Sequence, residues 1–306
     1  MNMSAQLIII AGATATGKSD LAVELAKKID AEIVNADSMQ LYRGMDIGTA
    51  KLTMDERQGI PHHLLDLVSV KDDVNVAWYQ DLARAKIDEL RSAGKSVVVV
   101  GGTGLYIKAI LDDLNFPDTD PAIRQKITDE AETQGNDVMH ARLAELDPAA
   151  ALAIPKENVR RVIRALEVIE ITGAPYTASL PREGSSRYPE AQQFGLVLDR
   201  EKLDPRIDAR VEKMWERGLV EETTHLIKEG LLEGQTAQRA LGYAQIIKMA
   251  MGQMSEAEAK EETKRATRQY ARRQETWFSK DTRITWIAPA TTSVHLEKVL
   301  ASIITT

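Results

Sequence analysis

Short runs of aliphatic and β-branched residues alternate with helical segments along much of the chain. This alternation predicts an α/β fold with a parallel sheet, because helical crossovers join parallel strands. The clearest strand, Ser96–Val100, is apolar throughout, as expected of a strand that is covered on both faces. The other expected strands are Leu7–Ala11, Glu32–Ala36, Phe194–Leu198 and Ile284–Ile287, and the expected helices include Ser19–Ile29, Trp78–Ser92 and Leu105–Leu111.

The pattern changes near Pro117, beyond which we expect no strand until Gln193. Helical periodicity fills residues 120–172, and Asp120 is expected to cap a helix that starts with Pro121. A segment rich in Pro, Gly and Ser, residues 172–190, follows and predicts a loop. We therefore expect an α/β core formed by residues 1–118 and 190–306, with a helical C-terminal part, and a helical insertion domain formed by residues 119–189.

The composition, with 43% hydrophobic and 28% charged residues, is typical of a soluble globular protein. The absence of cysteine excludes disulfides, cysteine-ligated zinc and a thiol nucleophile. The N-terminus does not resemble a signal peptide, and no apolar run is long enough to cross a membrane. We expect a cytoplasmic monomer without a membrane partner. A net charge of −7 argues mildly against a nucleic-acid partner, unless basic residues cluster locally.

A phosphate-binding signature stands between the first expected strand and the first expected helix. Gly12, Gly17, Lys18 and Ser19 have the spacing of a P-loop, whose backbone N–H groups surround a phosphate. Lys18 adds a positive charge, the Ser19 hydroxyl can bind magnesium, and the helix presents its positive end to the anion. On its own, this loop indicates a nucleotide kinase-like core that binds ATP or another nucleotide.

An ordinary P-loop NTPase also needs an acidic residue at the end of another strand, where it holds magnesium. The clearest strand is followed instead by the acid-free segment Gly101–Gly104, whereas Asp37 follows the second strand. Because ligands bind at the carboxyl ends of parallel strands, we expect Asp37–Gln40 and Gly101–Thr103 to lie beside the P-loop. There Asp37 would bind magnesium, act as a base or cap a turn.

Eight sequence blocks are spread over nearly the whole chain. They are GATATGKS (12–19), NADSMQLYRGMDIGTAK (35–51), PHHLLD (61–66), GGTGLYIKAIL (101–111), DPAIR (120–124), NVRRVIRALEV (158–168), ALGYAQ (240–245) and TRQYARRQETWF (267–278). Together these blocks resemble the bacterial tRNA dimethylallyltransferase family, also called tRNA isopentenyltransferases. The P-loop departs mildly from the family pattern, with Ala13 and Thr16 where Pro and Ser are common, and so do the residues around Gly242 and Tyr243. Neither departure removes a chemical group that the reaction needs.

The resemblance implies transfer of a dimethylallyl group from dimethylallyl diphosphate to the exocyclic N6 amine of an adenosine in tRNA. That adenosine lies 3′ of the anticodon in tRNAs that read codons beginning with U, so the partner is the anticodon stem-loop. The P-loop would hold the donor's diphosphate as a leaving group, which explains why no acid follows the clearest strand. The target base must leave the anticodon stack to reach a buried pocket, where Gln40 has the donor and acceptor needed to read an adenine edge.

The resemblance also implies roles for individual residues. Asp37 accepts the proton of the amine, Lys18 stabilises the leaving group, Thr103 lies at the mouth of the reaction channel, and Ser19 binds magnesium, the one cofactor expected. The diphosphate contacts are Gly12, Ala13, Thr14, Ala15, Thr16, Gly17, Lys18 and Ser19, with Arg210 preferred to Arg206 as a further contact. The tRNA contacts are Asp37, Ser38, Met39, Gln40, Thr103, Arg124, Arg160, Arg161, Val162, Ile163, Arg164, Arg239, Gly242 and Tyr243.

Two basic stripes give this acidic chain a way to bind RNA. The first is Arg160, Arg161 and Arg164; the second is Arg265, Arg268 and Arg272, with Lys264 and Arg273 beside it. Such stripes can follow phosphates, but charge alone favours ordinary solvated helices in which nearby glutamates pair with the arginines. The resemblance favours an RNA role for the first stripe. For His62 and His63 we expect a structural or pocket-wall role rather than metal binding, since no third ligand is evident.

Two other functions stay open at this point. A P-loop kinase of a nucleoside or small metabolite explains the P-loop and Asp37 equally well, but not the long block around Gln40. A non-enzymatic P-loop module that binds RNA or nucleotide is disfavoured by the intact set of Lys18, Ser19 and Asp37.

Overall fold

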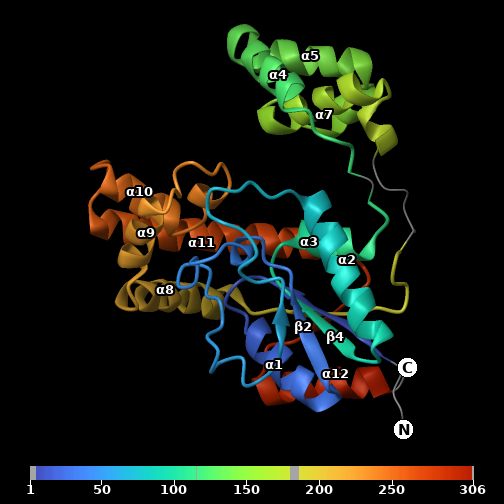
Figure 1. The fold of residues 1–306 in the computed structure, drawn as a ribbon, viewed down its shortest axis with the longest axis vertical. Helices are drawn as coiled ribbons and strands as arrows, with labels where there is room; N and C mark the ends of the chain where they lie inside the picture. Colours follow the sequence, from blue (N-terminus) through green and yellow to red (C-terminus); the bar gives the residue numbers. More distant parts are fainter. Residues whose placement is uncertain (1–4, 115, 180–185, 305–306) are drawn as a thin grey trace. The chain divides into compact units, whose positions relative to one another are not determined.

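Figure 1 shows the computed structural model, which describes residues 5–114, 116–179 and 186–304. The chain divides into two compact units, one of residues 1–111 with 188–306 and the other of residues 112–187. The second unit starts at 112 rather than at 119, and Asp112 pairs with Ser186 in an antiparallel bridge where the chain enters and leaves it. Of the loop predicted over 172–190, residues 180–185 lie outside the described residues.

Unit one is built on a six-stranded sheet with the order β3-β2-β4-β1-β5-β6. Every neighbouring pair in this sheet is parallel. The carboxyl ends of β1, β2 and β4 therefore meet at one edge, where the segments that follow them form the site. The strands are β1 (Leu7–Gly12), β2 (Ala31–Asn35), β3 (His62–His63), β4 (Ser96–Val100), β5 (Gln192–Leu196) and β6 (Ile284–Ile287).

Alternate residues of the central strands serve two separate cores. Leu7 and Ile9 of β1 pack with α2 (Val76–Ser92), α3 (Gly104–Leu111) and the end of α11 (Glu256–Phe278). Ile8 and Ile10 pack on the opposite face with α1 (Lys18–Ile29) and α12 (Thr292–Ile304). This two-sided cover explains the continuous apolar run of β4, because both faces of that strand are buried.

The predicted α/β architecture is confirmed, and all five expected strands exist. The structure adds β3, which the sequence did not reveal because it is only two histidines long and pairs with the edge of β2. Strand β5 lies two residues earlier than expected, since its pairing with β1 starts at Gln192.

A helical layer follows β5 and forms a third core with the segment after β2. It contains α8 (Arg200–Glu216), α9 (Leu219–Lys228), the short η3 (Ala237–Arg239) and α10 (Tyr243–Ala250). Tyr42, Met45 and Tyr243 are fully buried between these helices and the loop after η1 (Met39–Leu41). This layer therefore fixes the loop that carries the longest resemblance block.

The second unit is a helical bundle with its own core. It consists of α4 (Pro121–Gln134), α5 (Asn136–Leu146), α6 (Pro148–Ala153) and α7 (Val159–Thr172), followed by η2 (Tyr176–Ser179). Asp120 caps α4 as predicted, accepting hydrogen bonds from the backbone N–H of Ala122 at 2.8 Å and of Ile123 at 3.2 Å. Ile127, Leu143 and Leu166 lie at the centre of its core.

Within the described part of the chain, none of the helices combines the length and the apolar character that crossing a bilayer requires.

Candidate active site

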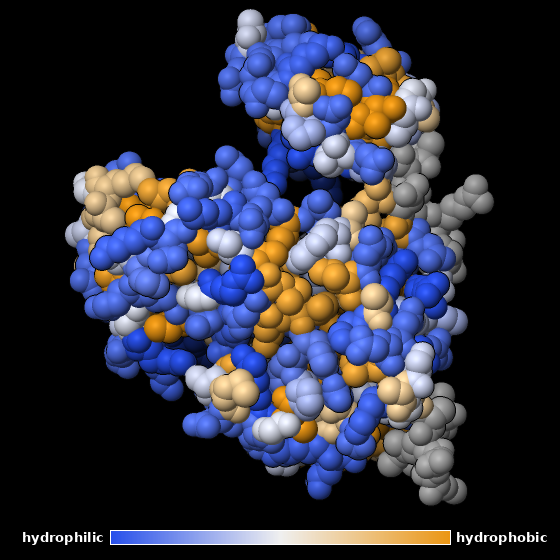
Figure 2. Space-filling model, in the orientation of Figure 1, coloured by the Kyte–Doolittle hydropathy of each residue, from blue (hydrophilic) through white to orange (hydrophobic). Residues whose placement is uncertain are grey.

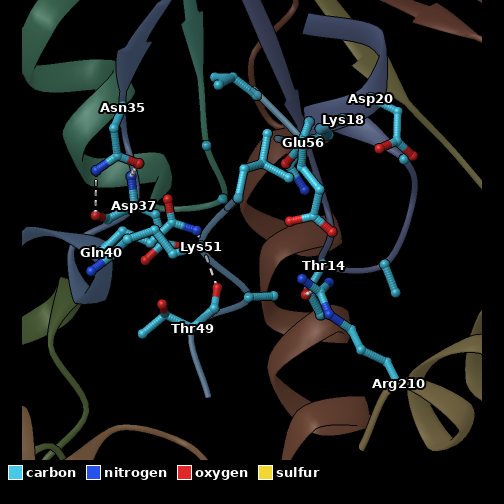
Figure 3. Close-up of a pocket in the computed structure, with 18 of the residues that line it drawn as sticks. Thr14, Lys18, Asp20, Asn35, Asp37, Gln40, Thr49, Lys51, Glu56 and Arg210 are labelled. Carbon is cyan, nitrogen blue, oxygen red and sulfur yellow. Dashed lines mark hydrogen bonds between the residues drawn. The ribbon is translucent and has the colours of Figure 1, made fainter. Parts of the chain in front are cut away.

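A pocket of about 570 Å³ opens at the carboxyl edge of the sheet of unit one. The P-loop, Asp37, Gln40, Gly101 and one face of α8 line this pocket. In the view of Figure 3, Asn35, Asp37 and Gln40 lie on one side of it and Thr14 and Arg210 on the other. The segments that follow β1, β2 and β4 therefore line one pocket, as the sequence predicts.

The P-loop is held open by backbone geometry that only small residues allow. Gly12 has φ +134°, and a Cβ there would stand 2.7 Å from the carbonyl oxygen of Leu196 in β5. Gly17 precedes α1 with φ +96°, and nothing lies within 4 Å of the place that its Cβ would take. The open side of the loop can therefore admit an anion.

Gln274 of α11 joins the P-loop to the loop after β4, and the sequence analysis missed this role. Its side-chain oxygen accepts the N–H of Thr14 at 2.9 Å, and its amide donates to the carbonyl of Gly102 at 2.8 Å. A Cβ at Gly102 would stand 2.2 Å from that amide nitrogen. The buried Gln274 thus fixes the spacing of both loops.

Lys18 and Arg210 bring two cations to the P-loop side of the pocket. Lys18 Nζ donates to the carbonyl of Ala13 at 2.5 Å, and Arg210 donates to the Thr14 hydroxyl at 3.1 Å. Desolvation, helped by the nearby Arg210 charge, lowers the pKa of Lys18 to about 7. Burial also lowers the pKa of Arg210. Both cations are poorly solvated, so an anion bound between them would be strongly stabilised.

Asp37 faces these cations from the segment after β2. Its Oδ1 accepts the N–H of Met39 at 2.9 Å, and Asn35 holds its backbone through the Asp37 N–H at 3.0 Å and the Asp37 carbonyl at 2.9 Å. Burial raises the pKa of Asp37, although the Met39 N–H and the Lys18 charge oppose this. A desolvated carboxylate with a raised pKa is a stronger base than a solvated one.

Thr103 and Ser38 contact each other beside Asp37 and Gly102, and neither is among the residues that line the pocket. Thr103 Oγ1 accepts the Ser38 N–H at 3.1 Å and lies 3.4 Å from the Ser38 hydroxyl. Tyr270, which the sequence analysis left without a role, lines the pocket and hydrogen-bonds to Thr103. Burial raises the pKa of Tyr270 to about 12, so its phenol is protonated at neutral pH and can donate a hydrogen bond.

Gln40 is positioned by a loop that a glutamate from α9 holds in place. Its side-chain amide donates to the carbonyl of Thr49 at 3.1 Å. Glu222, missed by the sequence analysis, accepts the N–H groups of Asp46, Ile47 and Gly48 at 2.9–3.3 Å. Three consecutive N–H groups bound to one carboxylate fix this loop, and with it the carbonyl that orients Gln40.

Tyr243, expected to contact tRNA, is buried against this loop instead. Tyr243 is fully buried, and its hydroxyl donates to Glu222 at 2.5 Å. A Cβ at Gly48 would stand 2.4 Å from the Tyr243 ring, so the two residues pack directly. Gly242 has φ +86° at the start of α10. Tyr243 therefore supports the loop that orients Gln40. Arg239, also expected to contact tRNA, is exposed.

The helical unit presents only part of its predicted tRNA set. Arg160 and Arg161 are exposed at the start of α7. Arg124 and Arg164 both donate to the fully buried carboxylate of Glu167, at 2.7 Å and 2.9 Å. Val162 is buried, and Ile163 packs partly against the same core. The side chain of Val162 therefore cannot contact RNA in this arrangement. Arg164 stabilises the helical unit through its ion pair with the buried Glu167.

The second basic stripe is paired within the protein. On α11, Lys264 binds Glu212 at 2.5 Å, Arg268 binds Asp208, and Arg272 lies 3.8 Å from Asp204. These three acids recur every four residues along one face of α8. Its other face, the α8 cationic face, consists of Arg206, Arg210, Lys213 and Arg217, and all four line the pocket.

Magnesium fits this site through few protein ligands. Ser19 lines the pocket at the start of α1, and no cluster of three acidic or histidine side chains suited to a metal exists among the described residues. Magnesium in phosphate sites keeps several waters and binds one or two protein groups plus substrate oxygens. His63 contacts Glu32 at 2.6 Å, whereas His62 lines the pocket, as expected of structural and pocket-wall residues.

Comparison with known proteins identifies relatives with this architecture. Residues 40–281 match the IPP transferase family. A tRNA dimethylallyltransferase of Thermobifida fusca is 57% identical over 286 residues, covering 92% of this chain and 89% of that protein. The crystal structure of the full-length tRNA isopentenylpyrophosphate transferase from Bacillus halodurans matches with a TM-score of 0.71 and 37% identity, over 98% of this chain and 95% of that one. A eukaryotic dimethylallyltransferase, crystallised acting on tRNA, matches with a TM-score of 0.76 and 28% identity, over 93% of this chain and 74% of that one. The chain belongs to the IPP transferase family.

Proposed function

We propose that this chain is a tRNA dimethylallyltransferase. It transfers the dimethylallyl group of dimethylallyl diphosphate to the N6 amine of the adenosine 3′ of the anticodon, in tRNAs that read codons beginning with U. One observation carries the proposal: the P-loop and Asp37 line one pocket from opposite sides. A leaving diphosphate and a proton acceptor are then separated by the space in which a carbon atom is transferred.

The donor side stabilises the leaving group. When the bond between the allylic carbon and the bridging oxygen breaks, negative charge develops on the diphosphate. Lys18, Arg210 and the N–H groups of the P-loop lie where this charge forms, and they act in a poorly solvated pocket. Magnesium bound at Ser19 would supply further charge stabilisation of the diphosphate oxygens.

The acceptor side removes a proton. The N6 amine is weakly basic, so it must lose a proton as its bond to the allylic carbon forms. The carboxylate of Asp37 accepts that proton, and its raised pKa makes it a better acceptor. The products are the alkylated adenosine and pyrophosphate, with one proton released from the amine.

Two features support an RNA acceptor: Gln40 in the pocket and the exposed arginines of the helical unit. Gln40 is held at the pocket with its amide oriented by Thr49, and a base can be read there through its edge. The exposed Arg160 and Arg161 of the helical unit add phosphate contacts. The kinase alternative is not favoured, since the relatives are named tRNA dimethylallyltransferase and tRNA isopentenylpyrophosphate transferase. The monomeric state and cytoplasmic location expected from the sequence stay predictions.

The proposal is tested with anticodon stem-loops that differ only in the group at C6 of one purine base. We expect a stem-loop with adenosine 3′ of the anticodon to gain one C5H8 unit from dimethylallyl diphosphate, as measured by mass spectrometry. A matched stem-loop with inosine at that position should gain nothing, because inosine lacks the N6 amine. Equal modification of both RNAs would contradict N6 as the acceptor, and modification of neither would contradict the proposed function.

A further inference from the structure

The α8 cationic face extends past the part of the pocket that one diphosphate can occupy. Arg210 is fixed beside the P-loop through its hydrogen bond to Thr14. Arg217 follows seven residues later, so it lies about 10 Å further along the helix axis. A diphosphate bound by the P-loop and Arg210 is shorter than this separation. Arg217 therefore lines the pocket beyond the reach of that anion, and Lys213, about 4.5 Å along the axis from Arg210, lies between the two arginines.

These two outer cations are available to an incoming ligand. The other face of α8 uses its acids against α11, as Glu212 does with Lys260 and Lys264. Lys213 and Arg217 have no ion pair among the described residues. Glu56 also lines the pocket, and its pKa is lowered chiefly by the Thr53 N–H, with the Arg217 charge as a lesser cause. Two exposed positive charges thus face the pocket without a carboxylate that neutralises them.

The geometry of the transfer indicates which anion these cations bind, the diphosphate of the donor or a phosphate of the acceptor RNA. A nucleophile that displaces a leaving group at carbon approaches from the side opposite that group. Asp37 lies on the acceptor side, and Arg210 and Thr14 lie on the leaving-group side. Lys213 and Arg217 continue the Arg210 side of the pocket along the same helix face. They therefore face the route of the diphosphate rather than the position of the acceptor base.

We propose that Lys213 and Arg217 form an outer diphosphate subsite. This subsite holds the donor's diphosphate before it reaches the P-loop and holds pyrophosphate as it leaves. The inference rests on the proposed function and deepens it, because it assigns a second binding position to the same donor. No bond is made or broken there.

The test compares two double variants with equal loss of charge. Lys213→Gln with Arg217→Gln removes the outer subsite, whereas Lys202→Gln with Lys228→Gln removes two exposed cations that do not line the pocket. For each enzyme, the KM for dimethylallyl diphosphate, the KM for the stem-loop and the inhibition constant of inorganic pyrophosphate are measured at low and high salt. Both sets of positions are exposed, so folding should be preserved.

We expect the subsite variant to raise the donor KM and the pyrophosphate inhibition constant about three- to tenfold at low salt. Both should approach the wild-type values at high salt, because exposed charges are screened there. The stem-loop KM and the control variant should not change. A raised stem-loop KM with an unchanged donor KM would overturn the proposal in favour of an RNA phosphate, and unchanged values throughout would overturn it outright.

The proposal can fail separately from the proposed function. If the wild type transfers no C5 unit, the function is contradicted, but calorimetric binding of pyrophosphate to both double variants still tests the subsite. Equal pyrophosphate affinity in the two variants at low salt would then reject it.

Discussion

Helices α8 and α11 each carry a row of cations at helical spacing, yet the two rows meet opposite surroundings. The α11 row, represented by Arg268 and Lys264, is neutralised by acids of α8. On the α8 cationic face, Lys213 and Arg217 have no such acidic partners within the described part of the chain, and they line the pocket instead. The spacing of charges along a helix therefore does not reveal their role, which depends on what the fold places opposite them.

The same contrast separates the pocket from the rest of the molecule. Burial desolvates three charged groups of the pocket, and it shifts their pKa values away from those in water. These groups are Lys18, Asp37 and Arg210. Glu222, by comparison, is satisfied by three N–H groups and the Tyr243 hydroxyl. Perturbed groups in a pocket are candidates for chemistry, whereas satisfied groups hold structure.

The largest expected effect is that of Asp37→Asn. Loss of the proton acceptor should lower the single-turnover rate about 10²–10⁴-fold, with little change in donor affinity. Rapid-quench measurement of the transfer at saturating donor and RNA checks this. A single-turnover rate close to that of the wild type would show that Asp37 is not the base.

Asp37→Asn should also raise the melting temperature at neutral pH. Burial raises the folded-state pKa of Asp37, so its ionised form destabilises the fold. When pH rises above the pKa that Asp37 has in the unfolded chain, the free energy of unfolding falls, and it continues to fall until pH exceeds the higher pKa of the folded state. The stabilising effect of the substitution should therefore vanish at low pH, and a melting temperature that falls at neutral pH would contradict this sign.

The next effect is a pH dependence of donor binding. Lys18 has a pKa of about 7 in the free protein, and a bound diphosphate favours its charged form, which raises that pKa. Donor binding should therefore take up a proton above pH 7, and the Kd should rise about tenfold for each pH unit there. Calorimetry of donor binding in buffers of different ionisation enthalpy measures the uptake. Lys18→Arg should flatten the profile, because arginine stays charged.

A smaller effect is expected from the exposed arginines of the helical unit. Arg160→Gln with Arg161→Gln should weaken stem-loop binding about fivefold at low salt and reduce the slope of its salt dependence, because phosphate contacts release counterions. Filter binding over a salt series measures both. An unchanged slope would reject these two residues as phosphate contacts. Glu130→Gln, which breaks the ion pair of Arg142 elsewhere in the unit, is the control.

The smallest effect is expected where charges are already paired. Arg268→Gln removes an ion pair with Asp208 that is only partly buried. Solvent screens such a pair, so the loss of unfolding free energy should stay below about 1 kcal/mol. Stem-loop affinity should not change, as measured in the same salt series. A clear loss of RNA affinity would mean that the α11 cations bind RNA, and it would contradict the difference in role drawn between the two helices.

The sequence predicts the sheet and the meeting of the P-loop with Asp37, because strand–loop–helix order alone dictates which segments share an edge. Residues such as Gln274, Tyr270 and Glu222 escaped prediction, since each acts on a loop more than 150 residues away. The burial of Tyr243 and Val162 likewise depends on neighbours that a motif does not contain. The sequence shows which chemical groups exist, and the tertiary contacts decide which of them stay unpaired.

In the proposed function, the P-loop holds a prenyl diphosphate and not the triphosphate of a nucleotide that is consumed. The most direct measurement incubates the enzyme with equal amounts of dimethylallyl diphosphate and ATP, together with the adenosine stem-loop. We predict that each modified RNA gains one C5H8 unit, that one pyrophosphate is released for each modified adenosine, and that ATP stays intact. Phosphate transfer from ATP to the RNA or to another acceptor, without a C5 gain, would contradict the account.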